Sequence, residues 1–483
     1  MLSQLLSRFS SLTALAAVLL VLVPFWTSSK FQPLTAFDQP FYLGIAYDMV
    51  DAGRFTDGIV WATPSSSGER PSGMRFTPLY PSMLAGAAML EPGFRSAMDC
   101  TVESSAVAVT CPTTARLVRG MQFAMLAAVY VIVWRIAGIL AGSPRGAWIA
   151  LALALGTAPY LLRSVNYLMT EMTALFLSTA LAYAGVATAV RHSWRWAGVA
   201  GILLGLAALT RPSFLYLFVA VAVTGLAATL LVGPRRWRAV ALLLAVFGAG
   251  FVVPVGPWIV RNALVLGRPE LSFGYASDVL VQRISFDTMT WHEYAMSYLC
   301  GLPDGTGMGN LLIGPGACDR FGLTDGPDTF YGNGVGPLLN QTLEAAGGHE
   351  HHMSYLINNY LLREPLKHAL VTIPMALRGA WVQKYWGLVL GPICLVITIG
   401  ALRRRNLGFL ALAAPAWFML AFYAAVASNQ VRYNLMLIPP YAVAGAIGVE
   451  RWLARPRAQA MLAWACAPFR PRPIGPVSPY SER

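Results

Sequence analysis

The sequence contains few charged residues. Of its 483 residues, 12% are charged and 56% are hydrophobic. Soluble domains carry about twice that share of charge, so the composition predicts a polytopic membrane protein. Lysine is especially scarce, since only Lys30, Lys367 and Lys384 are lysines among 35 basic residues. We interpret this imbalance as a sign of a GC-rich bacterial genome and of nothing more. The expected location is a bacterial inner (plasma) membrane.

Several motifs of soluble enzymes are absent. The sequence contains no P-loop, no dinucleotide-binding glycine fingerprint, no serine-centred elbow and no CxxC pair. Nucleotide hydrolysis and soluble cofactor chemistry therefore have no support. The net charge of +13 does not indicate a nucleic-acid partner, because the arginines occur in short clusters between apolar stretches. Such clusters are typical cytoplasmic anchors of membrane helices.

The apolar stretches predict about ten transmembrane helices. The first follows Arg8 and lacks a cleavage site, so we expect an uncleaved span rather than a signal peptide. A span needs about 20 apolar residues. The stretches that meet this requirement lie near residues 10–27, 116–141, 147–163, 172–190, 196–210, 213–232, 239–258, 383–402, 407–427 and 434–453. The shorter stretch from Pro78 to Leu90 predicts an interfacial helix.

The arginine clusters predict the topology. All of them fall on one side of the membrane if the N-terminus is cytoplasmic. The predicted parts are a first transmembrane helix (1–27), a first polar segment on the outer face with interfacial helices (28–115), transmembrane helices 2–7 (116–260), a second polar segment on the outer face that could act as a lid (261–382), transmembrane helices 8–10 (383–453) and a disordered cytoplasmic tail (454–483).

The six cysteines divide in the same way. Cys100 and Cys111 lie in the first polar segment, and Cys300 and Cys318 lie in the second. Two local disulfides in an oxidising compartment fit this distribution, and four unpaired thiols are the alternative. Cys394 and Cys466 fall in a predicted span and in the tail, where we expect no disulfide.

Asp38 is the first candidate catalytic residue. It directly follows the first span, where an acidic residue is costly unless it acts on a polar substrate or ion. Asp48 and Asp51 follow at helical spacing and could instead form a solvated helix face. Tyr42, between these acids, is a candidate substrate-binding residue or an ordinary interfacial aromatic.

Several cations and a second acid are expected at the same membrane face. Arginine binds phosphate with its planar fork, so a lipid phosphate is the anion we expect there. Simple interfacial anchoring of the arginines is the alternative, and Glu171 could merely begin a helix. Arg211 lies between two apolar stretches, where it needs an anionic partner such as a phosphate or Glu171. The candidate substrate-binding residues are Tyr42, Arg163, Glu171, Arg211, Arg261 and Arg432.

The string His349-Glu350-His351-His352 resembles a metal site only weakly. His349 and His352 have helical spacing, but two ligands without a third do not make a zinc site. The sequence therefore predicts no metal ligand and requires no cofactor, and a divalent metal remains without support.

The order of several strings resembles a family. Asp38 begins a D-x-P-x-Y string, and TPLYPSMLAG, TEMTALFLSTALAYA, GLAALTRPSFLYLF, PWIVRNALVLGRP and VRYNLMLIPPYAVAGAIG follow as far as about Gly448. This order resembles GT-C type membrane glycosyltransferases, in particular the bacterial relatives of protein O-mannosyltransferases and the lipid A aminoarabinose transferase (ArnT-like) family.

The resemblance implies a polyprenyl-phosphate-linked sugar donor and sugar transfer on the outer face. It implies a general base at Asp38 and contacts of Arg211 and Arg261 with the donor phosphate. Two departures stand out: relatives often have paired prolines where this chain has Thr77-Pro78, and Asp-Glu where it has Asp38-Gln39. The second departure puts a two-carboxylate, metal-assisted site in doubt.

The leading hypothesis is an inverting glycosyltransferase. Its partners would be the lipid-linked donor, membrane lipids and a glycan, lipid or protein acceptor. The alternatives are a transporter or flippase of lipid-linked sugars, and a noncatalytic assembly subunit. Transporters tend to place ionisable residues near the bilayer midplane in matched halves of the chain. Here the polar residues gather at one predicted face, which favours the enzyme.

Overall fold

The protein is all-helical. The computed structural model describes residues 2–58, 70–103, 111–231, 237–303, 309, 311–324 and 326–456. Within these ranges, β pairing is limited to one isolated bridge between Thr56 and Ser72. This confirms the predicted all-α class.

Every predicted span contains a helix, although not every helix is long. Among the described residues, six helices are long and apolar enough to cross a membrane, and the pair α6 (Pro144–Leu155) and α7 (Ala158–Val165), bent by 58°, would make a seventh. The six are α1 (Leu2–Ser28), α5 (Arg116–Ala141), α8 (Glu171–Arg191), α11 (Trp237–Leu266), α19 (Tyr385–Arg403) and α20 (Leu407–Val426). The remaining three stretches form the shorter helices α9 (Trp194–Ala208), α10 (Phe214–Leu231) and α21 (Ile438–Leu453). The total of ten spans stays a prediction.

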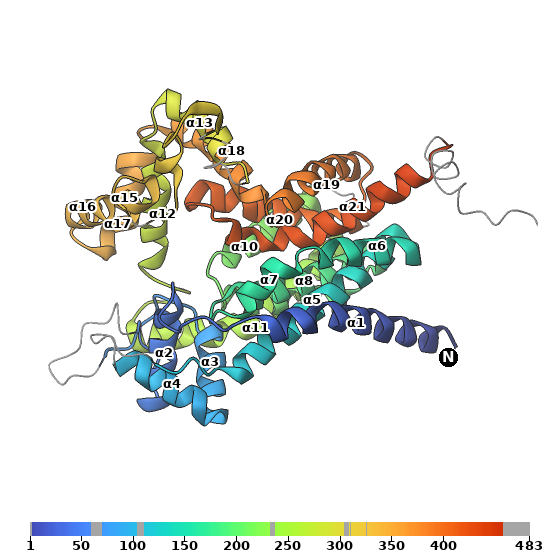
Figure 1. The fold of residues 1–483 in the computed structure, drawn as a ribbon, viewed down its shortest axis with the longest axis horizontal. Helices are drawn as coiled ribbons and strands as arrows, with labels where there is room; N and C mark the ends of the chain where they lie inside the picture. Colours follow the sequence, from blue (N-terminus) through green and yellow to red (C-terminus); the bar gives the residue numbers. More distant parts are fainter. Residues whose placement is uncertain are drawn as a thin grey trace, which may run out of the picture.

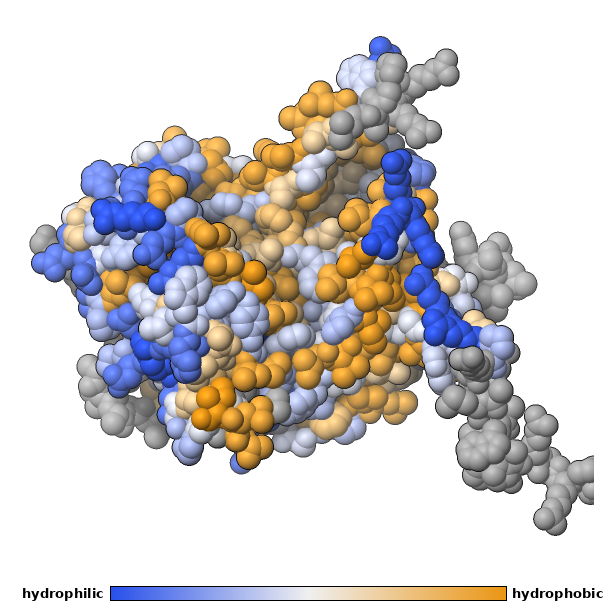
Figure 2. Space-filling model, turned by 90° about the horizontal axis from the view of Figure 1, so that it is seen from above, coloured by the Kyte–Doolittle hydropathy of each residue, from blue (hydrophilic) through white to orange (hydrophobic). Residues whose placement is uncertain are grey.

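The long helices form a bundle with both polar segments beyond the same end. Figure 1 shows α2–α4, α12, α13 and α15–α17 at that end, and the N-terminus at the other. Figure 2 shows hydrophobic residues over the middle of the molecule and hydrophilic residues gathered at its ends. An apolar belt between polar ends is what a bilayer requires of a spanning protein.

Small residues bring α9 and α11 into backbone contact. A Cβ atom on Gly201 would lie 2.0 Å from the Phe247 carbonyl oxygen, and one on Gly250 would lie 2.4 Å from that of Gly198. Close approach through glycine is typical of helices packed in membranes. It fixes the end of α9, from which the turn carrying Arg211 continues.

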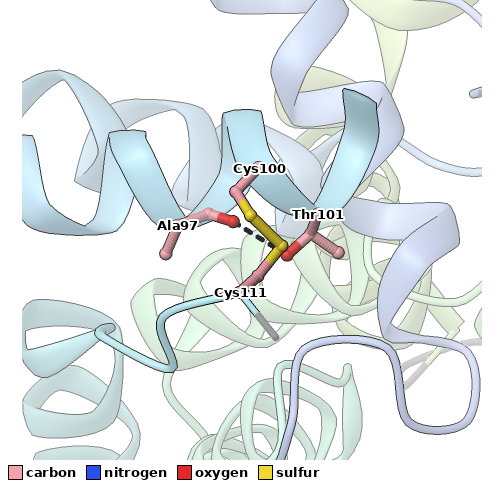
Figure 3. Close-up of a disulfide and its surroundings, with 4 residues drawn as sticks. All are labelled: Ala97, Cys100, Thr101 and Cys111. Carbon is pink, nitrogen blue, oxygen red and sulfur yellow. Dashed lines mark hydrogen bonds between the residues drawn. A yellow bond between two sulfur atoms is a disulfide. The ribbon is translucent and has the colours of Figure 1, made fainter. Parts of the chain in front are cut away.

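The described part of the first polar segment contains three short helices. They are α2 (Gln39–Asp51), α3 (Leu79–Leu90) and α4 (Pro92–Glu103). Helix α3 coincides with the predicted interfacial helix. A disulfide joins Cys100 of α4 to Cys111, and next to it the Thr101 hydroxyl donates a hydrogen bond to the Ala97 carbonyl (Figure 3).

The second polar segment is also helical and is linked by a second disulfide. Cys300 is bonded to Cys318, while Cys394 is free and buried. Both predicted pairings are confirmed. Cys466 and most of the predicted tail (residues 457–483) lie outside the described residues. The helical elements are α12 (Tyr275–Asp287), α13 (Trp291–Cys300), η1 (Asp319–Phe321), α15 (Phe330–Val335), α16 (Pro337–Ala346), α17 (His349–Leu356), η2 (Ile357–Leu361) and α18 (Pro365–Ala380).

Candidate functional site

Asp38 is paired with an arginine from the other end of the chain. Asp38 immediately precedes α2, and Arg432 lies in η3 (Val431–Leu437), between α20 and α21. The Arg432 Nη2 atom donates to Asp38 Oδ2 at 3.2 Å. The side chain of Asp38 is 40% exposed and that of Arg432 is 30% exposed, so an external molecule can reach both of them.

Arg211 and Glu171 form a tighter and more buried pair. Arg211 Nη2 lies 2.9 Å from Glu171 Oε1, and its Nε atom donates to the Thr170 hydroxyl at 2.8 Å. The side chains are 15% and 5% exposed. This confirms Glu171 as a partner of Arg211. Breaking a buried pair from one side leaves an uncompensated charge, so the two residues depend on each other.

The two pairs join into one network. Arg432 Nη1 lies 3.9 Å from Glu171 Oε1, and the ring of Tyr433 lies beside both guanidinium groups, 5.5 Å from Arg432 and 5.8 Å from Arg211. Two acids and two cations, from four separate parts of the chain, therefore meet without net charge. A small pocket adjoins them and is lined by Glu171, Ala174, Leu175, Ser178, Arg211, Phe214, Tyr423, Arg432, Tyr433, Leu435 and Met436.

Tyr42 lies at the edge of this network. Burial, followed by the negative charge of Asp38, raises the pKa of Tyr42 well above its usual value. Its phenol therefore stays neutral and can donate a hydrogen bond. Tyr42 also packs edge-on against Tyr80 and Phe76, which fixes the ring at the start of α2. The structure thus brings four predicted substrate-binding residues to Asp38: Tyr42, Glu171, Arg211 and Arg432.

Arg261 lies elsewhere and holds the first polar segment to α11. Its Nη1 atom donates to the Gly73 carbonyl at 2.7 Å, and Nη2 donates to the Phe55 carbonyl at 3.0 Å. The guanidinium also covers the Trp258 ring at 4.9 Å. These contacts favour a structural role, and its contact with a donor phosphate stays a prediction.

Arg163 also stays apart from the network. It lies in the last turn of α7, is exposed and forms no ion pair with any described residue. As for Arg261, the contact of Arg163 with a substrate stays a prediction.

Gln39, which follows Asp38, binds the backbone through its side chain. The side chain of Gln39 is fully buried. Its Oε1 atom accepts from the Leu168 amide at 2.7 Å, and Nε2 donates to the Pro33 and Ala36 carbonyls, both at 2.9 Å. All its polar atoms are committed to the backbone, so it offers no metal ligand beside Asp38. The residues here do not fit a two-carboxylate metal site.

Sequence reasoning missed the aromatic and hydroxyl partners of the network. Thr170 positions Arg211, and Tyr433 lies beside both arginines. Tyr423, in α20, shares a 2.6 Å hydrogen bond with Ser213 in the Arg211 turn. The only signal in the sequence was their adjacency to candidate residues, which Thr170 has to Glu171 and Tyr433 has to Arg432.

The arrangement combines an accessible carboxylate with two cations beside a small pocket. A carboxylate can accept a proton, and arginines can stabilise an anionic phosphate in the same place. Arg432 is the more available cation, because its contacts with carboxylates are longer than that of Arg211 and its side chain is more exposed. Its Nε atom donates to Gln430 Oε1 at 2.8 Å.

Comparisons with known proteins identify similar folds only. No protein-family model and no curated protein matches the chain. The chain is similar to the crystal structure of ArnT from Cupriavidus metallidurans bound to undecaprenyl phosphate, with a TM-score of 0.44, 15% identity and coverage of 95% of this chain and 63% of that chain. It is also similar to the archaeal oligosaccharyltransferase AglB from Archaeoglobus fulgidus in complex with an inhibitory peptide and a dolichol-phosphate, with a TM-score of 0.47, 14% identity and coverage of 95% and 52%. The chain thus spans less than two thirds of the length of either protein.

Proposed function

We propose that this protein is an integral membrane glycosyltransferase that takes a sugar from a polyprenyl-phosphate donor. The observation that carries the proposal is the Asp38–Arg432 pair, in which an accessible acid and an accessible cation lie 3.2 Å apart. Such a transfer needs both groups together: a base for the acceptor and a cation for the departing phosphate.

The reaction begins at the acceptor hydroxyl. The Asp38 carboxylate takes the hydroxyl proton, and the acceptor oxygen attacks the anomeric carbon of the sugar. The bond between that carbon and the phosphate oxygen breaks, and its electron pair leaves with the polyprenyl phosphate. Attack from the face opposite the phosphate inverts the anomeric configuration.

The leaving group needs positive charge rather than a proton. A polyprenyl phosphate is already ionised, so arginines can stabilise the charge that develops on it. Arg432 is the first candidate, because it can turn from Asp38 towards a phosphate without leaving a fully buried acid behind. Arg211 is held by Glu171 and Thr170 and supplies a fixed positive charge behind Arg432.

The acceptor would enter from the side of the polar segments. Tyr275, at the start of α12, packs against Phe76 of the first polar segment at 5.3 Å between ring centroids. Both segments lie beyond the same end of the bundle (Figure 1). We infer that this end faces the periplasm or exterior, and that the second polar segment helps to select a glycan, lipid or protein acceptor.

The test is a direct assay of donor turnover. Purified protein in detergent is incubated with radiolabelled polyprenyl-phosphate sugars and candidate acceptors, and released polyprenyl phosphate is separated from intact donor. Release with sugar transfer supports the proposal. Movement of intact lipid-linked sugar across proteoliposomes, without release of polyprenyl phosphate, would instead establish a flippase and overturn it.

A further inference from the structure

Three potential metal ligands converge in the second polar segment. Asp278 lies in the first turn of α12, while His349 and His352 lie on one face of α17. The Asp278 Oδ1 atom is 3.6 Å from His349 Nδ1 and 3.8 Å from His352 Nδ1. One ligand atom from each residue can be chosen so that all three lie within 4.8 Å of one another.

These three atoms have no hydrogen-bond partner among the described residues. Asp278 Oδ1, His349 Nδ1 and His352 Nδ1 are all buried atoms. The separations of 3.6 Å and 3.8 Å are too long for hydrogen bonds between them. Buried polar atoms are nearly always hydrogen-bonded, so three without a hydrogen bond, two of them within 3.8 Å of the third, require an explanation.

The remaining polar atoms of two of the ligands are already oriented. The Thr342 hydroxyl lies 3.0 Å from His352 Nε2, and Arg75 donates to Asp278 Oδ2. A donor or carbonyl on the far side of a ligand is the usual outer support of a metal-binding histidine or carboxylate. His352 is completely buried, so its ring cannot turn to water.

The spacing suits a small transition-metal ion. Metal–ligand bonds of about 2.0–2.1 Å in a tetrahedral site place neighbouring ligand atoms about 3.3–3.4 Å apart. The two separations from Asp278, 3.6 Å and 3.8 Å, therefore need only small side-chain shifts. The ligand atoms of the two histidines lie within 4.8 Å of each other and would have to move closer together to bind one ion. Two imidazoles favour zinc over magnesium or calcium, which prefer all-oxygen ligand sets.

We propose that Asp278, His349 and His352 bind one divalent transition-metal ion, of which Zn²⁺ is the best fit, with a water molecule at the fourth position. The ion would cross-link α17 to α12. Because Arg75 holds Asp278 from the first polar segment, the ion would also stiffen the junction between the two polar segments. This site is separate from Asp38, and the proposal does not depend on the glycosyltransferase activity.

The test measures Zn²⁺ binding by the full chain in detergent. Any polyhistidine tag is removed, bound metal is stripped with a chelator, and the protein is titrated with Zn²⁺ by calorimetry. We expect about one Zn²⁺ per chain and a higher melting temperature that a chelator reverses. His349→Ala should weaken binding at least about tenfold, since even loss of an outer-shell partner has effects of that size. This variant should fold, because the His349 side chain is 37% exposed.

The matched control lies in the same string. His351 is exposed and is not part of the cluster, so His351→Ala should bind Zn²⁺ like the unchanged protein. Equal Zn²⁺ affinity of His349→Ala and His351→Ala would overturn the proposal, as would the absence of stoichiometric binding. Co²⁺ gives a second readout, because a site with two nitrogen ligands should produce visible absorption bands that His349→Ala loses. Equal binding of Mg²⁺ would refute the transition-metal assignment.

Discussion

Asp38 and Arg432 are 394 positions apart in the chain, yet Arg432 Nη2 donates to Asp38 Oδ2 at 3.2 Å. The contact joins the segment after α1 to the turn before α21. It places the candidate base beside the candidate phosphate-binding cation. Substitutions of these two residues therefore test the proposed reaction.

Replacing Asp38 tests the proposed base. Asp38→Asn keeps the size and most of the hydrogen bonding of the side chain but removes the basic oxygen. We expect turnover to fall by about two to four orders of magnitude, with donor affinity little changed. The measurement is the rate of polyprenyl-phosphate release. Asp51→Asn is the control, since Asp51 lies at the far end of the same helix with its side chain 55% exposed. Near-normal turnover of Asp38→Asn would remove it from the base role.

Replacing Arg432 tests the proposed contact with the leaving group. Arg432→Gln removes the charge and the planar fork, so we expect donor affinity to fall at least about tenfold. Stability should change by no more than about 1 kcal/mol, because a partly exposed ion pair contributes little and Glu171 keeps Arg211 as its closer cation. Titration with donor measures the first effect and thermal unfolding the second. Arg363→Gln, at an exposed arginine of the second polar segment, is the control for removal of one charge. If both variants bind donor equally, Arg432 has no role in donor binding.

Replacing Arg211, in contrast to Arg432, should mainly lower the stability of the protein. Arg211→Met leaves Glu171 buried without its closest cation, and we expect a loss of stability of about 3–5 kcal/mol. Replacing Glu171 with Met as well should recover most of that loss, because no unpaired charge remains. Thermal unfolding of the single and double variants gives the coupling between the two residues. Additive losses would show that the pair is not an energetic unit.

Gln39 should resist replacement by glutamate. In Gln39→Glu a carboxylate oxygen would face the Pro33 and Ala36 carbonyls, which now accept hydrogen bonds. The buried carboxyl should therefore have a pKa above its unfolded value of about 4.3. The protonated form is tolerated below that value, so the destabilisation should be small there and grow as the pH rises through the folded-state pKa. Thermal unfolding against pH measures this. A destabilisation that does not depend on pH would contradict the burial argument.

The topology can be tested with single cysteines. In a background without Cys394 and Cys466, an impermeant maleimide applied from outside intact cells should label Asp328→Cys and should not label Arg404→Cys. Both positions are exposed, so accessibility within the fold does not limit labelling. Labelling of Arg404→Cys from outside would invert the predicted orientation and place Asp38 on the cytoplasmic side.

Much of this protein could be predicted from its sequence alone. The thickness of a bilayer fixes the length of an apolar helix, so hydropathy located all ten helical stretches without knowledge of their neighbours. Each polar segment has two cysteines close together in the sequence, and this spacing predicted both disulfides. The pairing of Arg211 with Glu171 was also accessible, because a cation between two apolar stretches needs a nearby anion.

Other contacts were decided by tertiary packing. The helical spacing of His349 and His352 placed them on one face, but the third ligand, Asp278, lies on α12 and becomes their neighbour only when α17 packs there. Arg261 was expected at a donor phosphate, yet the folding of the first polar segment over α11 offers it the Gly73 and Phe55 carbonyls. The local sequence pattern indicates what environment a residue requires, such as burial or a counter-charge. Which distant residue satisfies that need depends on how the helices pack against one another, and hydropathy does not encode that.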